Sequence, residues 1–483
     1  MEINLQPILP EIFISTMASF ILVLDLYLKP GRRTVAYVLS VITLLGGVWL
    51  IWRDFATGSV TTMNGMFIDD VFSDVIKIAV CLLSLLVFIY SREYIKARDF
   101  FLSEYFVLGL FAVVGMMVMA SANHFLVLYL GLELLSLCLY TMVAFQRDSG
   151  IATEAAMKYF VLGALGSAML LYGMSIIYGM TGSLYINIVR GAVSAQASPD
   201  NLILVLGLVF ILVSLAFKIG AVPFHMWVPD VYHGAPTSST LFVSTAPKLA
   251  GFAIIIRLLV GGLEDLHFMW RDMLIILAVL SIFIGNLIAI AQTNFKRMLA
   301  YSAISHMGFM LLGVLAGTAT GYSAGLFYAL VYTFMGLGGF GIVVLLSRAG
   351  FEADELNDLK GLNKQHPWYA FLILVFMFSM AGVPPTIGFF AKLAVIQAVI
   401  DVDLIWLAVI AVLLAVVGAF YYLRVIKLVY FDLPDKEAWI IEAPADIRLL
   451  LSANALALIL LLPLMGPIQD LCSQAISSVV SAF

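Results

Sequence analysis

Charged residues are scarce in this chain of 483 residues, where Asp, Glu, Lys and Arg together make up 11%. A water-soluble domain would carry roughly a quarter. The longest polar interval, about 348–367, is too short to form a soluble domain of its own. In place of charge, the chain is 63% hydrophobic and has a mean hydropathy of +1.08. These values exclude a soluble globular protein and indicate a polytopic protein embedded in a lipid bilayer.

Cysteines and recognisable cofactor motifs are also lacking. The three cysteines, Cys81, Cys138 and Cys472, lie far apart and make neither a metal-ligand pattern nor a disulfide framework. No Gly-rich phosphate loop, haem or iron–sulfur pattern, or nucleic-acid-binding patch is visible. The N-terminal stretch MEINLQPILPE lacks the basic region of a cleaved signal peptide, so we expect the first hydrophobic run to stay as a helix. We therefore expect no metal, cofactor or nucleic acid on this chain, and any redox chemistry to take place elsewhere.

Hydrophobic runs of about 20 residues recur from end to end, each long enough to cross a bilayer of about 30 Å. They predict an all-α membrane protein with about fourteen transmembrane helices. The twelfth run is overlong and is interrupted by Pro384 and Pro385. The predicted spans are approximately 8–28, 34–52, 70–90, 104–121, 124–145, 155–180, 201–222, 238–260, 272–291, 298–317, 322–347, 368–400, 404–430 and 447–466.

Basic residues are divided unevenly between alternate loops. Of the 25 Lys and Arg residues, 16 fall in one set of loops and 4 in the other. Because basic loops stay on the cytoplasmic side, this predicts both termini on the outer side of the membrane, which is the periplasmic side of a bacterial inner membrane or its equivalent. The larger set is Lys29, Arg32, Arg33, Arg92, Lys96, Arg98, Arg147, Lys296, Arg297, Arg348, Lys360, Lys364, Arg424, Lys427, Lys436 and Arg448; the smaller is Arg53, Arg190, Arg257 and Arg271.

Charges inside the predicted spans are few, and such groups normally face the bundle interior or a water-filled cavity. Lys77 is expected to be a surface lysine that extends towards the headgroups. Lys158 has Glu154 one turn before it, an arrangement that also suits an interfacial ion pair. The set that could transfer protons is Glu133, Lys158, Lys218, Lys248 and Lys392, with His225 and His306.

Two interpretations of this set stay open at this point. Each charge could belong to a buried ion pair that only orients helices, or the set could form a proton-conducting chain. The repetition of titratable groups on separate spans favours conduction. The absence of arginine from the set favours it too, because arginine does not give up its proton in proteins and lysine can.

Prolines interrupt two of the predicted spans beside a lysine. The segment GAVPF follows Lys218, and AGVPP precedes Lys392. Proline frees a backbone carbonyl, which a membrane tolerates only against protein or water. Matching broken helices indicate an internally repeated transporter. We expect Lys218 and Lys392 on one polar axis with Lys248 between them. The predicted parts are an N-terminal three-helix segment (1–103), two five-helix repeats (104–262 and 272–430), and a C-terminal connection with helix 14 (431–483).

Several long motifs make the chain similar to a known family. LGLELLSL, EAAMKYF, FKIGAVPFHMWVPDVYHGAP, QTNFKRMLAYSAISHMGF and AGVPPTIGFFAKL together resemble the antiporter-like membrane subunits of respiratory complex I. The resemblance covers nearly the whole chain and implies fourteen spans with two inverted five-helix repeats. The functional residues that it implies are Glu133 on the fifth helix, Lys158 on the sixth, Lys218 on the seventh, Lys248 on the eighth and Lys392 on the twelfth.

The resemblance also implies an activity and partners. The chain would be a proton-translocating subunit of an NADH:quinone oxidoreductase, coupled to quinone reduction in other subunits. NADH, flavin, iron–sulfur clusters and quinone would be bound by those subunits, and the neighbours would be other membrane-arm subunits. Two alternatives remain: a subunit of a multi-subunit sodium/proton antiporter, and a structural membrane-arm subunit.

Overall fold

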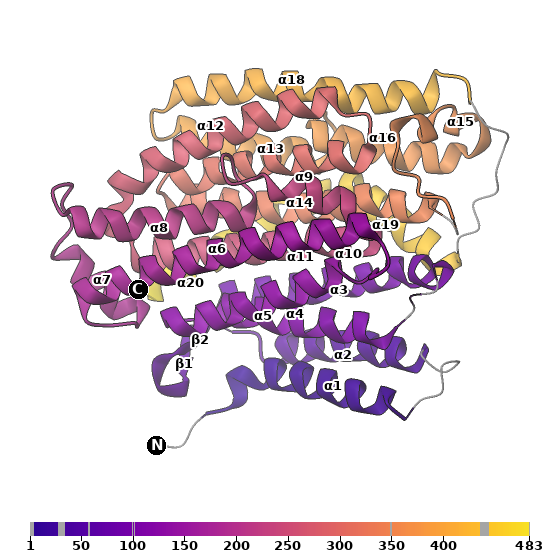
Figure 1. Cartoon of the computed structure of the whole chain (residues 1–483). Coiled ribbons are helices and arrows are strands. Elements are labelled where there is room, and N and C mark those ends of the chain that lie inside the picture. The colour runs from indigo at the N-terminus through magenta and orange to yellow at the C-terminus, as the bar shows by residue number, and fades with distance from the viewer. Residues whose placement is uncertain are drawn as a thin grey trace.

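The computed structural model describes residues 4–27, 34–56, 58–98, 100, 102–347, 350–434 and 444–482. It shows a bundle of long helices that run side by side, with one short β-hairpin at an end of the bundle (Figure 1). Five basic residues that contributed to the predicted orientation, Lys29, Arg32, Arg33, Arg348 and Lys436, lie outside the described residues.

The elements before the first break are helices except for the hairpin. They are α1 (Leu9–Asp25), α2 (Thr34–Arg53), β1 (Val60–Thr62), β2 (Phe67–Asp69), α3 (Val71–Ala97), α4 (Ser103–Ser121), α5 (Phe125–Val143), α6 (Gly150–Thr181), α7 (Ile186–Ser194) and α8 (Leu202–Ile219). β1 and β2 pair antiparallel, with Thr61 opposite Ile68. The sequence analysis predicted neither the hairpin nor α7.

The remaining elements are all helical. They are α9 (Trp227–Gly234), α10 (Thr237–Val243), α11 (Ala246–Ile255) with a π-helical continuation (Ile256–Gly262), α12 (His267–Ala291), α13 (Phe295–Leu315), α14 (Ala319–Leu346), α15 (Leu362–Gln365), α16 (Pro367–Ala381), α17 (Ile387–Ile400), α18 (Ile405–Tyr430), α19 (Ala445–Leu460) and α20 (Met465–Ala482).

The predicted all-α polytopic class is confirmed. In the described residues, 12 helices are long and apolar enough to cross a bilayer, or 13 if the bent pair α19–α20 counts as one span. Thr237–Gly262 counts as a single span in this total. The apolar helices α16 and α17 are each shorter than a full span. The predicted number of fourteen is therefore reached only if these two also count as one interrupted span.

Both predicted breaks are present. α8 ends at Ile219, where Gly220 has a positive φ of 78°, and helical structure resumes at Trp227. α16 ends at Ala381, where Gly382 has a φ of 82°, and helical structure resumes at Ile387. Glycine adopts this left-handed conformation without the strain that a Cβ would introduce, so it suits the end of each helix.

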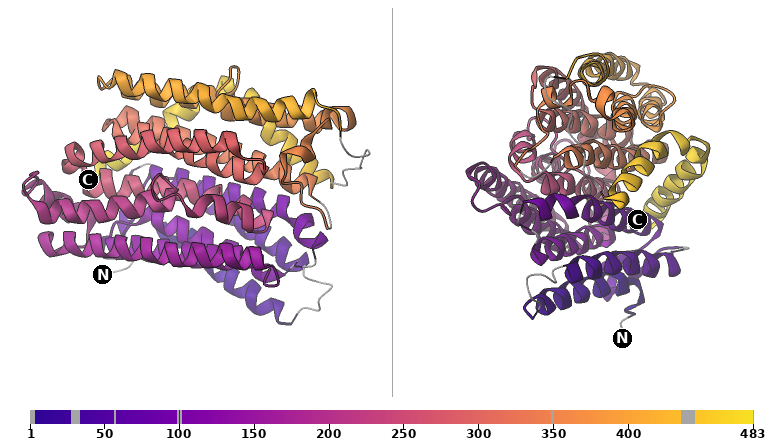
Figure 2. Two further views of the ribbon diagram at one scale, coloured as in Figure 1. Left: turned by 45° about the horizontal axis from the view of Figure 1, so that its top comes forward. Right: turned by 90° about the vertical axis from the view of Figure 1, so that its right-hand side faces the viewer.

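The bundle has an interior of helices that have little or no lipid-facing surface. All of the hydrophobic window of α13 is buried, and most of that of α14, whereas α18 and α6 expose much of their apolar surface. Figure 2 shows α18 and the N-terminal helices on opposite sides of the bundle. Side chains on α13 and α14 are therefore shielded from lipid by the chain itself.

α1 begins and α20 ends at the same end of the bundle, where β1, β2 and α7 also lie (Figure 1). This agrees with an even number of crossings. Two basic residues that were assigned to loops are instead buried in helices: Arg257 in the π-helical continuation of α11, and Lys296 on α13. The orientation of the bundle in the membrane remains a prediction.

Candidate functional site

The first break holds the ammonium group of Lys248. This lysine lies on α11 and is 3% exposed. Its Nζ donates a hydrogen bond of 2.9 Å to the Ile219 carbonyl, the last residue of α8. It also lies 5.1 Å from the centre of the Trp227 ring, on the far side of the break. A lysine from a neighbouring helix thus compensates a carbonyl that the helix break leaves free.

Lys218 turns away from the break that follows it. Its Nζ donates to the hydroxyl oxygens of Ser136 on α5 and Ser167 on α6, each at 3.0 Å. It forms no ion pair with Glu133, although the two groups lie within electrostatic range of one another. The sequence analysis expected freed carbonyls near Lys218, but the Ile219 carbonyl is bound by Lys248 instead.

Glu133 lies on α5, one turn before Ser136, and is partly buried. Its Oε1 is buried and has no hydrogen-bond partner among the described residues. The same helix face carries Leu130 and Leu137, which are 65% and 53% exposed. The carboxylate therefore stands between the Lys218 cluster and an apolar outer face of the chain.

The second break holds Lys392, which comes from the broken helix itself. It lies on α17 and is 9% exposed. Its Nζ donates to the carbonyl oxygens of Met380 and Ala381, each at 2.9 Å, at the end of α16. It also lies 5.1 Å from the centre of the Phe309 ring on α13. The ammonium thus bridges the two halves of the interrupted helix.

His306 lies on α13 at the centre of a network of hydroxyl groups. It is 2% exposed; its Nδ1 lies 2.7 Å from the Tyr328 hydroxyl, and its Nε2 lies 3.1 Å from the Tyr422 hydroxyl. The Tyr422 hydroxyl continues to the Ser302 hydroxyl at 2.5 Å. His306 also lies within electrostatic range of Lys392. A neutral imidazole that bridges two hydroxyl groups can accept a proton at one nitrogen and release one at the other.

His225 lies inside the first break, between α8 and α9, and is 8% exposed. Its Nδ1 is buried and has no hydrogen-bond partner among the described residues. An unpaired buried nitrogen in a polar segment is a position where a water molecule can bind. His225 is therefore placed at the break, but no described side chain links it to Lys248.

Lys158 lies apart from the buried lysines. Its side chain is 44% exposed and forms ion pairs with Glu154 at 2.9 Å and Asp230 at 2.8 Å. Asp230 on α9 also pairs with Arg297 on α13 at 3.0 Å. These contacts fit the interfacial arrangement that the sequence left open for Lys158.

The other buried cations in the described residues have carboxylate partners. Arg257 makes two 2.8 Å hydrogen bonds to Asp70, and both side chains are fully buried. Lys77 is 1% exposed and lies 3.0 Å from Glu11, so the expected surface location of Lys77 is wrong. Since Glu11 lies on α1 and Lys77 on α3, the pair connects two N-terminal helices.

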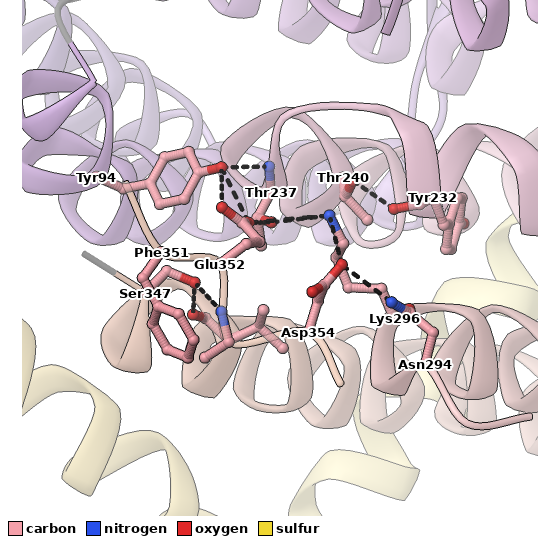
Figure 3. Close-up of polar contacts among 12 residues, drawn as sticks. Tyr94, Tyr232, Thr237, Thr240, Asn294, Lys296, Ser347, Phe351, Glu352 and Asp354 are labelled. Atoms are coloured by element: carbon pink, nitrogen blue, oxygen red, sulfur yellow. Dashed lines mark hydrogen bonds and ion pairs between the residues drawn. The ribbon is translucent and has the colours of Figure 1, made fainter. Parts of the chain in front are cut away.

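Lys296 is a third buried cation, and it lies where several segments meet (Figure 3). It is 4% exposed, and its Nζ lies 3.8 Å from Glu352, 3.9 Å from Asp354 and 3.3 Å from the Thr237 hydroxyl. Tyr94 on α3 donates to Glu352 as well. This network fastens the segment after α14 to α3, α10 and α13, which is a structural arrangement.

The partners of the candidate lysines could not be identified from the sequence. Ser136, Ser167, Tyr328 and Tyr422 occur within apolar runs in which single hydroxyl groups are common. One signal was available, since Ser136 follows Glu133 by three residues and so lies on the same helix face. The sequence therefore predicts the charged groups of the site better than the neutral groups that hold them.

Comparison with known proteins gives a consistent picture. A sequence profile described as "NADH:quinone oxidoreductase/Mrp antiporter, TM" matches residues 122–418. The NADH-quinone oxidoreductase subunit N of Thiobacillus denitrificans is 60% identical over 474 residues, which cover 98% of this chain and 97% of that protein. The subunit N of Nitrosomonas europaea is 53% identical over 459 residues, covering 95% of both chains.

Solved structures agree with the sequence relatives. A chain of respiratory complex I from Thermus thermophilus superimposes with a TM-score of 0.81 at 30% identity, covering 95% of this chain and 98% of that one. A chain of the Mrp complex from Dietzia gives a TM-score of 0.84 at 22% identity, covering 99% and 98%, which is a likeness of fold alone.

Proposed function

The chain belongs to the family of NADH-quinone oxidoreductase subunit N, the antiporter-like membrane subunits of complex I, and we propose that it moves protons along a buried axis of Glu133, Lys218, Lys248, His306 and Lys392. As a subunit of this translocase, it works together with the other subunits of complex I. Proton movement along the axis would be coupled to quinone reduction in those other subunits.

One observation carries the proposal: the three candidate lysines are held by neutral groups. Lys218 is bound by two hydroxyls, Lys248 by one carbonyl and Lys392 by two carbonyls. In the described part of the chain, no carboxylate lies within ion-pair distance of any of them. By contrast, Arg257 and Lys77 have carboxylate partners. A lysine bound by neutral acceptors can lose its proton without leaving an unpaired buried carboxylate behind.

The same contacts suggest how protons would pass. A charged Lys218 would be stabilised by a charged Glu133, and loss of the Glu133 charge would favour release of the proton from Lys218. The hydroxyl–imidazole network of His306 would accept a proton near Lys392 and conduct it through Tyr328 or Tyr422. His225 would contribute through water bound in the first break, and Lys158 would act at the interface rather than within the axis.

The deciding experiment uses the assembled complex in proteoliposomes. Proton uptake per electron transferred is compared between the unaltered complex, Lys248→Met and Lys296→Met. Lys296 is a matched control because it is also buried but lies beside carboxylates in a structural network. We expect Lys248→Met to lower the proton-to-electron ratio without preventing assembly. An unchanged ratio in an assembled Lys248→Met complex would remove this lysine from the axis.

The experiment also separates the alternatives. A structural subunit predicts that neutral substitutions reduce the amount of complex while the ratio per assembled complex is maintained. A sodium/proton antiporter predicts transport that responds to external sodium rather than to NADH oxidation. The family membership favours the complex I activity.

We further propose that both termini face the periplasm of a bacterial inner membrane. The basic asymmetry of 16 against 4 supports this orientation, and it becomes 15 against 3 when the buried Lys296 and Arg257 are both left out. Lys96, whose side chain is 68% exposed, and Arg53, whose side chain is 43% exposed, suit cysteine labelling at opposite ends of the bundle. We expect Lys96→Cys to react only from the cytoplasmic side and Arg53→Cys only from the periplasmic side. Labelling with the sides exchanged would overturn the orientation.

Partners and cofactors follow from the family. The neighbours would be the other membrane-arm subunits of complex I and the lipid bilayer, with no nucleic acid. No group of three or more His, Cys, Asp or Glu residues that could hold a metal occurs among the described residues. NADH, flavin, iron–sulfur clusters and quinone would be bound by other subunits.

A further inference from the structure

A second cluster of buried titratable groups lies at the hairpin end of α3, outside the helices of the proposed axis. Its centre is Lys77, whose Nζ lies 3.0 Å from Glu11 on α1 and 3.5 Å from Asp69 on β2. Asp74, on α3 one turn before Lys77, is 3% exposed and accepts a 2.8 Å hydrogen bond from the Ala56 N–H. Three carboxyl groups therefore surround one ammonium group in a place that water hardly reaches.

The charges of this cluster do not balance when every group is ionised. Asp70, the neighbour of Asp69, is already paired with Arg257 through two hydrogen bonds, so that pair is neutral. Three carboxylates and one ammonium then sum to a net charge of −2. No other cation lies within ion-pair distance of these carboxyls in the described part of the chain. A buried excess of negative charge is strongly unfavourable, and carboxyl groups in such surroundings bind protons instead.

Two details of geometry support protonation. The Lys77 ammonium lies closer to Glu11, at 3.0 Å, than to Asp69, at 3.5 Å, so its single charge offsets the Glu11 carboxylate first. Asp69 and Asp74 then remain as two like charges within electrostatic range of one another, which favours binding of a proton by one of them. Glu11 is 4% exposed, and neither of its carboxylate oxygens has a hydrogen-bond partner among the described residues apart from the ionic contact with Lys77. Burial raises the pKa of the Asp69 carboxyl above its ordinary value, against the lowering effect of Lys77.

We propose that Glu11, Asp69, Asp74 and Lys77 form a proton-holding site that carries at least one exchangeable proton at neutral pH. The proton is held chiefly by the Asp69 or the Asp74 carboxyl, because the Lys77 charge lies closest to Glu11. Other titratable groups near the site are the Asp70–Arg257 pair and the buried Cys81 thiol, which lies within electrostatic range of Glu11 and Lys77. The site involves α1, β2 and α3, so it exists whether or not the proposed axis conducts protons.

The location gives the site a role if the proposed orientation holds. α3 begins beside the β-hairpin, at the same end of the bundle where α1 begins and α20 ends (Figure 1). In that orientation the site faces the periplasm, where translocated protons leave. A partly exposed carboxyl, Asp69, whose side chain is 15% exposed, would exchange the stored proton with water.

Infrared spectroscopy of the intact complex in lipid tests the site directly. At neutral pH the unaltered complex should show the carbonyl stretching band of a protonated carboxyl that Asp74→Asn lacks. Asp74→Glu keeps the carboxyl and should retain a shifted band. Asp54→Asn is the matched control, because Asp54 is a carboxylate of the same end that is paired with exposed Arg53, and the band should persist.

The outcomes decide the proposal without reference to the axis. A protonated-carboxyl band that is unchanged in both Asp74→Asn and Asp69→Asn would overturn it. If Asp74→Asn does not assemble, Asp69→Asn gives the same readout from a side chain at the rim. Loss of the band in either variant, with Asp54→Asn unchanged, supports the site. Because the band is measured without turnover, it would survive in Lys248→Met even if that variant no longer pumps.

Discussion

At both helix breaks a lysine ammonium group binds the backbone carbonyls that the break leaves free, but the two lysines come from different parts of the fold. At the first break, between α8 and α9, the free Ile219 carbonyl is bound by Lys248 from α11. At the second, between α16 and α17, the free carbonyls of Met380 and Ala381 are bound by Lys392 from the continuing half of the same helix. The comparison teaches that a proline break fixes where a carbonyl becomes free, whereas packing decides which ammonium binds it.

This difference changes what each lysine can do. Lys392 combines two tasks, since it joins the two halves of its own helix and would also carry a proton. In the first half these tasks are divided: Lys248 binds the break, while Lys218 lies between two serine hydroxyls within reach of the Glu133 field. In the first predicted repeat, the charge of Glu133 therefore acts on Lys218. In the second predicted repeat, the titratable neighbour of Lys392 is His306.

The largest effect should come from removing Lys392, which both joins the two halves of its helix and would carry a proton. We expect Lys392→Met to lower proton transport at least about tenfold, because loss of a positioned proton-transfer group typically reduces rates by 10²–10⁴. Lys218→Met should reduce transport but leave the first break intact. Transport by the assembled complexes in proteoliposomes measures both. Equal transport in Lys392→Met and the unaltered complex would refute the assignment of Lys392.

Replacing lysine by arginine sharpens the comparison between charge and proton transfer. Lys392→Arg keeps a cation at the second break but cannot release its proton. We expect transport to fall several-fold while assembly is retained, and Lys248→Arg to behave in the same way. The matched control is Lys296→Arg, which should leave transport near its normal level because its neighbours are the carboxylates of Glu352 and Asp354. Normal transport in Lys392→Arg would show that only the charge matters.

Glu133→Gln tests whether the charge of Glu133 controls proton release from Lys218, an effect that we expect only in the first of the two predicted repeats. The amide keeps the shape of the side chain and removes both its charge and its proton exchange. We expect assembly to be largely intact, proton transport to be reduced a few-fold, and NADH oxidation to lose part of its coupling. Proton-to-electron ratios check this outcome. If they are unaltered, Glu133 does not act on Lys218.

Gly220 and Gly382, the glycines that end the helices at the two breaks, can each be replaced by alanine, which adds one methyl group at each position. A Cβ at Gly382 would lie 2.8 Å from Cδ of Lys392, whereas one at Gly220 would lie 2.6 Å from a methyl group of Val228. Alanine is also strained at positive φ, so each change should destabilise the chain by more than about 1 kcal/mol. We expect Gly382→Ala to reduce transport per assembled complex more than Gly220→Ala. Complex yield on native gels and transport assays separate the two effects.

The smallest effects should come from the serines that hold Lys218. A hydrogen bond to a charged group contributes about 1.5–3 kcal/mol, but Ser136→Ala leaves the Ser167 hydroxyl in place. We expect a change in transport of about two- to threefold in either single variant and a larger change in the double variant. Ser214→Ala is the control, because that hydroxyl is buried on α8 without a hydrogen-bond partner in the described chain. Equal effects at Ser136 and Ser214 would contradict the assigned contacts.

The sequence predicted the helices and both breaks because these depend on local properties. Apolar runs matched to the bilayer predicted the positions of α2 and α18 within a few residues, and the prolines predicted the ends of α8 and α16. The short elements β1, β2 and α7 were missed because they lie between apolar runs and have no periodic pattern of their own.

Contacts between distant segments could not be predicted in the same way. Lys77 was interpreted as a surface lysine because its partner Glu11 belongs to a different helix. Arg257 and Lys296 were assigned to loops because the carboxylates that make their burial possible, Asp70 and Glu352, lie far away in the sequence. The identity of a buried cation's partner is a property of packing, which one sequence read in isolation does not contain.

The fully buried pair of Asp70 and Arg257 also constrains how the chain is made. The two residues lie 187 positions apart, so Asp70 leaves the ribosome long before Arg257 exists. At about 5–20 residues per second, the carboxylate waits roughly 10–40 s for its partner. During that interval α3 must keep Asp70 at the membrane surface or protonated, since an unpaired carboxylate is unfavourable in lipid. The ionised pair can therefore form at its final depth only after α11 has been inserted beside α3.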